Sequence, residues 1–247
     1  LILYTFMNKL ITITEVADSL GYSVATLRRW DKNGSLLAFR KDKKEHRRYM
    51  ISDIETFSEK LDKFKIAKHW AKNEKGFEPL PRYFCSDSFV FQSRLLRLER
   101  DLRENNRTSD FISILLSVVG QIGNNSFDHN LGNWQDIAGI FFSYDLKRRN
   151  IVLADRGQGI LKTLRKAKPS LRNHEQALKT AFTEIISGRA PEHRGNGLKF
   201  VKRSIANSKM KLFFQTGDAK INLKKGVDLK VDKAKNNIVG CLANITF

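Results

Sequence analysis

The run Asp155-Arg156-Gly157-Gln158-Gly159 follows directly on the apolar residues 151–154, Ile-Val-Leu-Ala. A short apolar run that ends in a glycine-rich turn is typical of a buried strand. An Asp at the end of such a strand exposes a carboxylate at the edge of a sheet, and the glycines after it let a flat ligand approach the backbone closely. Asp155 is therefore expected to accept a hydrogen bond from an amino group such as that of adenine.

Upstream, residues 121–128 read Gln-Ile-Gly-Asn-Asn-Ser-Phe-Asp. Helical spacing of apolar side chains over the preceding residues predicts a helix whose buried stripe is formed by Ile114, Leu115, Val118, Val119 and Ile122. Asn125 and Asp128 are three residues apart, so they share one face of that helix. We expect this face to look towards the same site as Asp155.

Downstream, Gly195-Asn196-Gly197 leads into a second amphipathic run, in which Leu198, Val201 and Ile205 recur at helical spacing. Free backbone amides at the start of a helix attract anions, and the helix dipole adds to this attraction. The sequence therefore predicts a phosphate site at this helix start.

In this order and spacing the three segments resemble those of the GHKL ATPases (gyrase, Hsp90, histidine kinases and MutL), whose ATP site has the Bergerat fold. The resemblance covers roughly the last two-thirds of the chain. It implies that Asn125 holds Mg²⁺ on the phosphates of ATP, that Asp155 reads adenine and that Asp128 is a further polar position of the site. The remaining nucleotide-binding residues that it implies are Gly157, Gly159, Gly195, Gly197 and Leu198.

Residues 160–194 occupy the place of the mobile ATP lid in that family. Arg194 stands nearest to the phosphate loop in sequence, so it is the best candidate for the γ-phosphate; a solvated loop residue is the alternative. Hydrolysing relatives carry a Glu four residues before the magnesium Asn, whereas this chain has Gln121. An amide cannot act as a base at neutral pH, so ATP binding is expected more strongly than hydrolysis, and no catalytic residue is assigned.

The amino-terminal residues show a different pattern. Thr12 and Glu15 form a capping box that opens a short helix ending at Gly21, and Ser23 is placed to cap a second, Arg-rich helix. Two short helices joined by a Gly-containing turn indicate a helix-turn-helix. Residues 36–40 and 46–50 are expected as the two strands of a wing.

This stretch resembles the DNA-binding domain of MerR-type and excisionase-like regulators, carried by the segments TITEVA, VATLRRW and HRRY. The resemblance implies that the second helix enters the major groove and that the wing contacts the DNA backbone. The residues implied are Thr26, Arg28 and Arg29 on the helix and Arg47, Arg48 and Tyr49 on the wing. A winged helix that docks a protein instead remains an alternative.

The formal net charge of +19 favours a polyanionic partner. Of the 45 basic and 26 acidic residues, 16 and 11 lie within the first 80 residues, so 29 and 15 follow them. The positive charge is therefore not confined to the helix-turn-helix. The two cysteines, Cys85 and Cys241, have no metal-site spacing, which indicates a reducing, cytoplasmic setting. The longest apolar stretch is too short for a membrane span.

Together these patterns predict an α+β protein of two domains: a MerR-like winged helix-turn-helix (7–58), a basic linker (59–88) and a GHKL-type α/β sandwich (89–247). We expect a DNA-binding regulator in which ATP and Mg²⁺ modulate binding to double-stranded DNA or to a partner. A homodimer or a regulatory protein partner is a further expectation. The alternative is a protein kinase or slow ATPase that uses the helix-turn-helix for docking.

Overall fold

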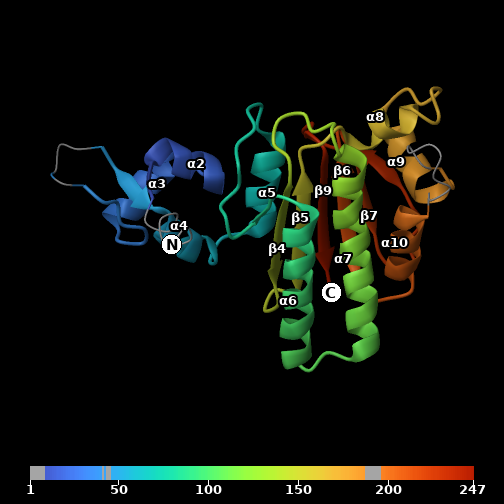
Figure 1. Cartoon of the computed structure of the whole chain (residues 1–247), viewed down its shortest axis with the longest axis horizontal. Coiled ribbons are helices and arrows are strands. Elements are labelled where there is room, and N and C mark those ends of the chain that lie inside the picture. Colours follow the sequence, from blue (N-terminus) through green and yellow to red (C-terminus); the bar gives the residue numbers. More distant parts are fainter. Residues whose placement is uncertain (1–8, 41, 43–45, 187–195) are drawn as a thin grey trace.

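The computed structural model describes residues 9–40, 42, 46–186 and 196–247. The amino-terminal part contains the helices α2 (Ile13–Leu20), α3 (Val24–Lys32) and α4 (Ile51–Ser58) and the strands β1 (Leu10–Thr12) and β2 (Arg48–Met50). The two strands pair antiparallel, with Ile11 opposite Tyr49. This part lies at one end of the molecule (Figure 1).

The helix boundaries predicted here are confirmed. Thr12 and Glu15 cap α2 reciprocally, and Gly21 ends it in the left-handed conformation at φ 70°. The Ser23 side chain accepts a hydrogen bond from the Thr26 amide and caps α3. The turn between the two helices is therefore determined by residues that are readable in the sequence.

The wing differs from the expectation. Residues 36–40 do not form a strand; in the described part of the chain they make a single bridge, between Phe39 and Arg48. The returning strand β2 pairs instead with β1, which was not predicted. Three residues of β1 directly precede α2, too few for an alternating pattern to be recognised.

The segment expected as a basic linker also folds. It contains α5 (Lys63–Lys72) and β3 (Phe84–Cys85). Asp62 caps the start of α5, and Ile66, Ala67, Trp70 and Ala71 form its buried face. Figure 1 shows α5 between the helix-turn-helix and the large sheet. The many lysines of this segment led to its prediction as a linker. Its buried apolar residues nevertheless recur three and four positions apart, as in an amphipathic helix.

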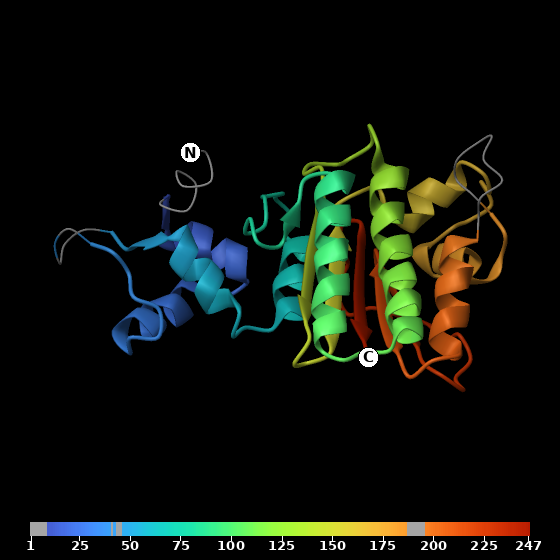
Figure 2. The ribbon, with the colours of Figure 1, turned by 60° about the horizontal axis from the view of Figure 1, so that its bottom comes forward.

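The second part of the chain is built on a seven-stranded sheet in the order β3-β4-β5-β9-β6-β7-β8, in which all neighbours are antiparallel. The strands after β3 are β4 (Ile140–Asp145), β5 (Asn150–Asp155), β6 (Lys211–Thr216), β7 (Ala219–Leu223), β8 (Val231–Lys233) and β9 (Cys241–Thr246). The helices are α6 (Ser88–Glu104), α7 (Ser109–Asn130), α8 (Gly159–Arg165), α9 (His174–Thr183) and α10 (Gly197–Ala206). Figure 2 shows α6, α7 and α10 side by side on one face of the sheet.

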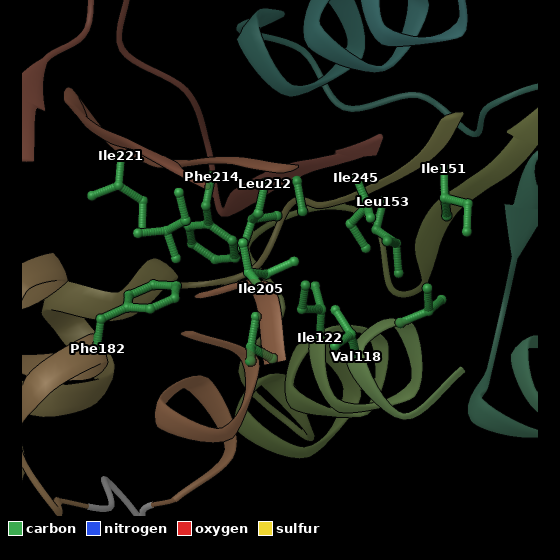
Figure 3. Packing of buried hydrophobic residues seen from close by; sticks show 14 of the residues in the cluster. Val118, Ile122, Ile151, Leu153, Phe182, Ile205, Leu212, Phe214, Ile221 and Ile245 are labelled. Atoms are coloured by element: carbon green, nitrogen blue, oxygen red, sulfur yellow. The ribbon is translucent and has the colours of Figure 1, made fainter. Parts of the chain in front are cut away.

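One core lies between the sheet and these helices. In Figure 3 Val118 and Ile122 of α7 and Ile205 of α10 face Leu153, Leu212 and Ile245 of the sheet. All six side chains are at most 4% exposed. Burial of this apolar area is the main stabilising contribution to the second part of the chain.

A second core runs from the helix-turn-helix through α5 to the opposite face of the sheet. It joins Val16 and Leu20 of α2 to Trp70 of α5 and to Val152 and Leu242 of the sheet. The two parts of the chain therefore share α5 as a common packing element. In the described part of the chain, no helix is both long and apolar enough to cross a membrane.

Candidate functional site

The Asp155 carboxylate lies at the end of β5 and is only 2% exposed. Its oxygens accept hydrogen bonds from the Ser126 hydroxyl at 2.8 Å, the Gly157 amide at 2.9 Å and the Asn130 side-chain amide at 3.5 Å. Ser126 and Asn130 lie one turn apart on α7. A buried carboxylate is thus held in a fixed orientation between β5 and α7.

Burial raises the pKa of Asp155 to about 6, against the hydrogen bonds from Gly157 and Ser126, which lower it. The carboxylate is therefore ionised at neutral pH but loses its charge in mildly acidic solution. Perturbed carboxyl groups of this kind cluster at functional sites, although buried structural groups show them as well.

The affinity for adenosine, a probe without phosphates, is expected to fall at acidic pH. If Asp155 accepts a hydrogen bond from the adenine amino group, binding needs the ionised form, whose pKa is about 6. Below that pH the dissociation constant should rise by up to about tenfold per pH unit. Titration calorimetry from roughly pH 5 to 8 measures this. Asp155→Asn should bind weakly and without this pH dependence, and an equally steep profile in that variant would assign the proton to another group.

The glycines around Asp155 pack against protein side chains. A methyl group at Gly157 would overlap the Asn130 side chain, and one at Gly159, where φ is 70°, would lie 3.1 Å from the Thr216 hydroxyl. These glycines were expected to leave room for a ligand, but Asn130 and Thr216 fill the space beside them. Their small size serves first to bring α7 and β6 close to the 155–159 turn.

Asn125 and Gly197 lie on a neighbouring part of the same site. The Gln121 side chain donates a hydrogen bond to the Asn125 Oδ1 at 3.3 Å, and the same Gln121 side chain occupies the space next to the Gly197 Cα. Gln121 therefore contacts both Asn125 and the start of α10, where the phosphate site is expected. Leu198 is half-buried and packs against the core of the second part.

Asp128 is exposed on α7 and is not among the side chains that hydrogen-bond to Asp155. Its place in the site stays a prediction. Arg194 and Gly195 lie outside the described residues, and their roles stay predictions as well.

Sequence reasoning missed Ser126, Asn130 and Thr216. Thr216 is fully buried, donates to the Gly240 carbonyl at 3.1 Å and accepts from the Ile160 amide at 3.2 Å. The spacing of Ser126 and Asn130 on α7 places them on one face, which could have pointed to a pair of polar groups facing Asp155. Thr216 comes from a strand 61 residues later in the chain, and no local signal connects it to the site.

Arg156 was also missed. Its side chain is 0% exposed and forms a two-pronged ion pair with Asp136, with Nη2 2.5 Å from Oδ2 and Nε 3.0 Å from Oδ1. The other end of the guanidinium donates to the backbone carbonyls of Trp70 at 2.6 Å and Asn73 at 2.9 Å. A buried Arg is tolerated because these partners compensate for its lost hydration.

In the helix-turn-helix, Arg28 and Arg29 are exposed on α3, and Thr26 is half-buried beside the Ser23 hydroxyl at 3.0 Å. Arg48 is exposed on β2. These side chains are accessible to a partner, as the sequence predicts.

Two of the wing residues are placed differently from the expectation. Arg47 donates to the Asp31 carboxylate at 2.7 Å, and Arg40 pairs with the same carboxylate, so Arg47 links the wing to the end of α3. Tyr49 is 1% exposed and lies in the core under the helix-turn-helix. Its position opposite Ile11 turns the ring inward, so in this structure it cannot reach a DNA backbone.

The model of the family described as MerR HTH family regulatory protein matches residues 11–59. No curated protein matches the chain. Among solved structures, the chain is similar to the 43K ATPase domain of Thermus thermophilus gyrase B in complex with an aminocoumarin. The identity is 18%, the match covers 52% of this chain and 32% of that one, and the TM-score is 0.32.

Residues 11–59 are thus a MerR-type helix-turn-helix. The chain as a whole is an α+β protein in which this unit precedes an antiparallel sheet covered by helices. The second part resembles the GHKL ATPases in its three sequence motifs, and α7 connects the residues described from them. Its Ser126 bonds to Asp155 at the end of β5. Its Gln121 bonds to Asn125 and fills the space beside Gly197 at the start of α10.

Proposed function

We propose that this protein is a cytoplasmic DNA-binding regulator in which ATP and Mg²⁺ modulate binding to DNA or to a protein partner. The observation that supports nucleotide binding most strongly is the buried Asp155 carboxylate, oriented by Ser126 and Asn130 of α7. The DNA half is supported by the MerR-type match over residues 11–59 and the exposed arginines of α3.

At the nucleotide site, Asp155 would accept a hydrogen bond from the amino group of adenine. It would so select adenine over guanine, which has a carbonyl oxygen at that position. The Asn125 side-chain oxygen would help hold Mg²⁺, which neutralises the phosphate charge when bound. The first amides of α10, a helix of ten residues, would face the phosphates. The site would be shaped by the packing of Gly157, Gly159 and Leu198 against the rest of the protein.

Gln121 supports binding without rapid turnover. Its side chain is an amide that donates to Asn125, so it supplies no carboxylate to activate water. A regulator that stays loaded with ATP is therefore favoured over a fast ATPase. The kinase or slow ATPase reading predicts transfer or slow hydrolysis by another group.

Titration calorimetry of ATP with and without Mg²⁺, run beside a phosphate-release assay, tests this proposal. Saturable binding that strengthens with Mg²⁺ and little phosphate release are expected. Rapid phosphate release would favour the enzyme, and no heat of binding at any Mg²⁺ concentration would remove the nucleotide half of the proposal.

Alanine substitutions of the arginines in the helix-turn-helix should weaken DNA binding in different ways. Arg28→Ala or Arg29→Ala removes a residue of the predicted recognition helix, so whichever of the two reads a base should lose about 1–3 kcal/mol and relax specificity. Arg48→Ala should weaken binding to all sequences alike and lower the salt slope by roughly one phosphate contact. A salt series on a selected operator and on random duplex separates the two effects.

Arg47→Ala serves as the comparison, because Arg47 is paired with Asp31 in the free protein and its loss should act mainly on folding stability. If Arg28→Ala, Arg29→Ala and Arg48→Ala all bind both duplexes as the parent does, α3 and β2 do not touch DNA. The helix-turn-helix would then be a protein-docking module.

A further inference from the structure

The carboxyl-terminal end of α5 is fastened to the two backbone segments that flank Asp155. Arg156, the next residue after Asp155, donates to the carbonyls of Trp70 and Asn73 at 2.6 and 2.9 Å. The Val239 amide donates to the carbonyl of Ala71 at 2.8 Å. The Trp70 carbonyl also accepts the Asn73 amide at 3.3 Å, so the Arg156 bond adds to that one. The bond from Val239 supplies a partner to the Ala71 carbonyl in the last turn of the helix.

Both segments also touch Asp155 itself. Arg156 is joined to it covalently, and Val239 precedes Gly240, whose Cα lies so close to Asp155 that a methyl group there would overlap the Asp155 carbonyl oxygen. Gly240 in turn accepts the hydrogen bond from Thr216. A small shift of Asp155 therefore moves the groups that hold the end of α5.

The opposite side of α5 carries the helix-turn-helix. A methyl group at Gly21 would lie 2.7 Å from the His69 Cβ, which shows how closely the turn between α2 and α3 packs on α5. The Lys65 ammonium lies 3.8 Å from the centre of the Tyr22 ring. Tyr22 directly precedes Ser23, the capping residue of α3. Any rotation or translation of α5 therefore displaces the start of α3, the predicted recognition helix.

We propose that Arg156 is a positioning residue that couples the nucleotide site to the helix-turn-helix through α5. This inference rests on the proposed function. Arg156 is 0% exposed, and its guanidinium holds Asp136 and two carbonyls in one plane. Because a planar group with fixed donors cannot adjust to one partner without losing another, it transmits a displacement instead of absorbing it. Nucleotide occupancy at Asp155 would then bias the orientation of α3.

The nature of the two interfaces supports this direction. On the sheet side α5 is held by directional hydrogen bonds from Arg156 and Val239, whereas the contacts described above on the helix-turn-helix side are apolar packing and one cation–π contact. A displaced α5 should therefore follow the sheet and shift the turn between α2 and α3 relative to α4. The α4 helix is tied separately to the segment before β3, by bonds from Arg82 to Glu55 and between Ser58 and Tyr83.

The test uses Arg156→Lys and, as a matched control, Arg148→Lys. Lys keeps the charge but cannot form the two-pronged pair and the two carbonyl bonds together. Arg148 likewise fastens the α5 region to the sheet, through the carbonyls of Leu61 at 3.2 Å and Lys60 at 3.3 Å, but it lies at the opposite end of β5 from Asp155. Both variants loosen the attachment of α5, and only one does so at the nucleotide site.

For each protein the dissociation constant for one operator duplex is measured with and without ATP and Mg²⁺, together with the affinity for ATP and the melting temperature. In the parent protein and in Arg148→Lys the ratio of the two DNA constants should be at least about fivefold, the low end of allosteric coupling. In Arg156→Lys it should fall below about twofold, while ATP affinity changes by less than about threefold. A ratio in folded Arg156→Lys equal to that of the parent overturns the inference.

Trp70 gives a second readout that does not depend on the Arg156→Lys and Arg148→Lys variants. With Trp30→Phe and Trp134→Phe, Trp70 is the single tryptophan, and the Arg156 guanidinium lies 5.9 Å from its ring. ATP with Mg²⁺ should change its emission. Measurable ATP binding with an unchanged Trp70 spectrum overturns the inference alone, whereas no ATP binding at all removes the proposed function and the inference with it.

Discussion

Asp155→Ala is expected to abolish measurable ATP binding in a protein that still folds. The buried carboxylate is expected to select adenine by accepting a hydrogen bond from its amino group. Ser126, Asn130 and Gly157 donate to the carboxylate and fix its orientation. Folding should survive because burial already disfavours the charge of Asp155, as its raised pKa of about 6 indicates. Titration calorimetry gives the affinity, and thermal unfolding confirms the fold.

Asp145→Ala is the matched control. Asp145 ends β4 at the far end of the same hairpin, opposite Asn150, and its carboxylate accepts from the Arg148 amide at 2.9 Å. This variant should keep the parent affinity for ATP. Asn125→Ala should bind ATP with little dependence on Mg²⁺. Undiminished affinity in a folded Asp155→Ala protein would show that the site has been assigned to the wrong carboxylate.

Gly240→Ala is expected to cost roughly 2–5 kcal/mol of folding free energy and to remove ATP binding. Gly240 has φ 67°, and a methyl group there would overlap the backbone of Asp155. The left-handed backbone alone costs a side chain about 1–2 kcal/mol. Forcing a methyl group into filled space adds roughly 1–3 kcal/mol, and more where rigid backbone is displaced.

Gly226→Ala separates the cost of the left-handed backbone from the cost of the overlapping methyl group. Gly226 has φ 72°, but a methyl group there would meet nothing within 4 Å. This control should lose only the backbone term of about 1–2 kcal/mol. Urea unfolding of both variants provides the comparison. Equal losses of folding free energy in the two variants would mean that the Gly240 backbone can move away from Asp155. The close packing of Gly240 on Asp155 would then not be needed to hold the site.

The local features of the chain could be predicted from its sequence because they depend on neighbouring residues. Thr12, Glu15 and Ser23 cap their helices through bonds to residues three positions away. Asp155 and the turn after it also form one local unit, with Gly157 donating to the Asp155 side chain. In each case the partner lies within three residues, so the pattern contains the whole interaction.

The features that could not be predicted depend on residues far apart in the chain. Arg156 is paired with carbonyls more than 80 positions away, and Thr216 reaches the site from another strand. Alone in the sequence, Arg156 reads as a charged turn residue. Only the fold shows that it is buried.

The wing illustrates a different limit. Tyr49 alternates with Arg48 along β2, and the choice of which faces inward depends on the partner strand. Because β1 was not recognised, Tyr49 was assigned to the DNA-facing side, whereas it lies in the core at 1% exposure. Arg47, which was also assigned to DNA, pairs with Asp31, sixteen residues earlier, and its contact with DNA stays a prediction.

ATP binding and DNA binding by this one chain should each affect the other. The most direct measurement is fluorescence anisotropy of a labelled operator duplex titrated with the full chain, with and without saturating ATP and Mg²⁺. We expect dissociation constants that differ by at least about fivefold between the two titrations. Identical curves, obtained where calorimetry shows the nucleotide bound, would mean that ATP does not affect DNA binding.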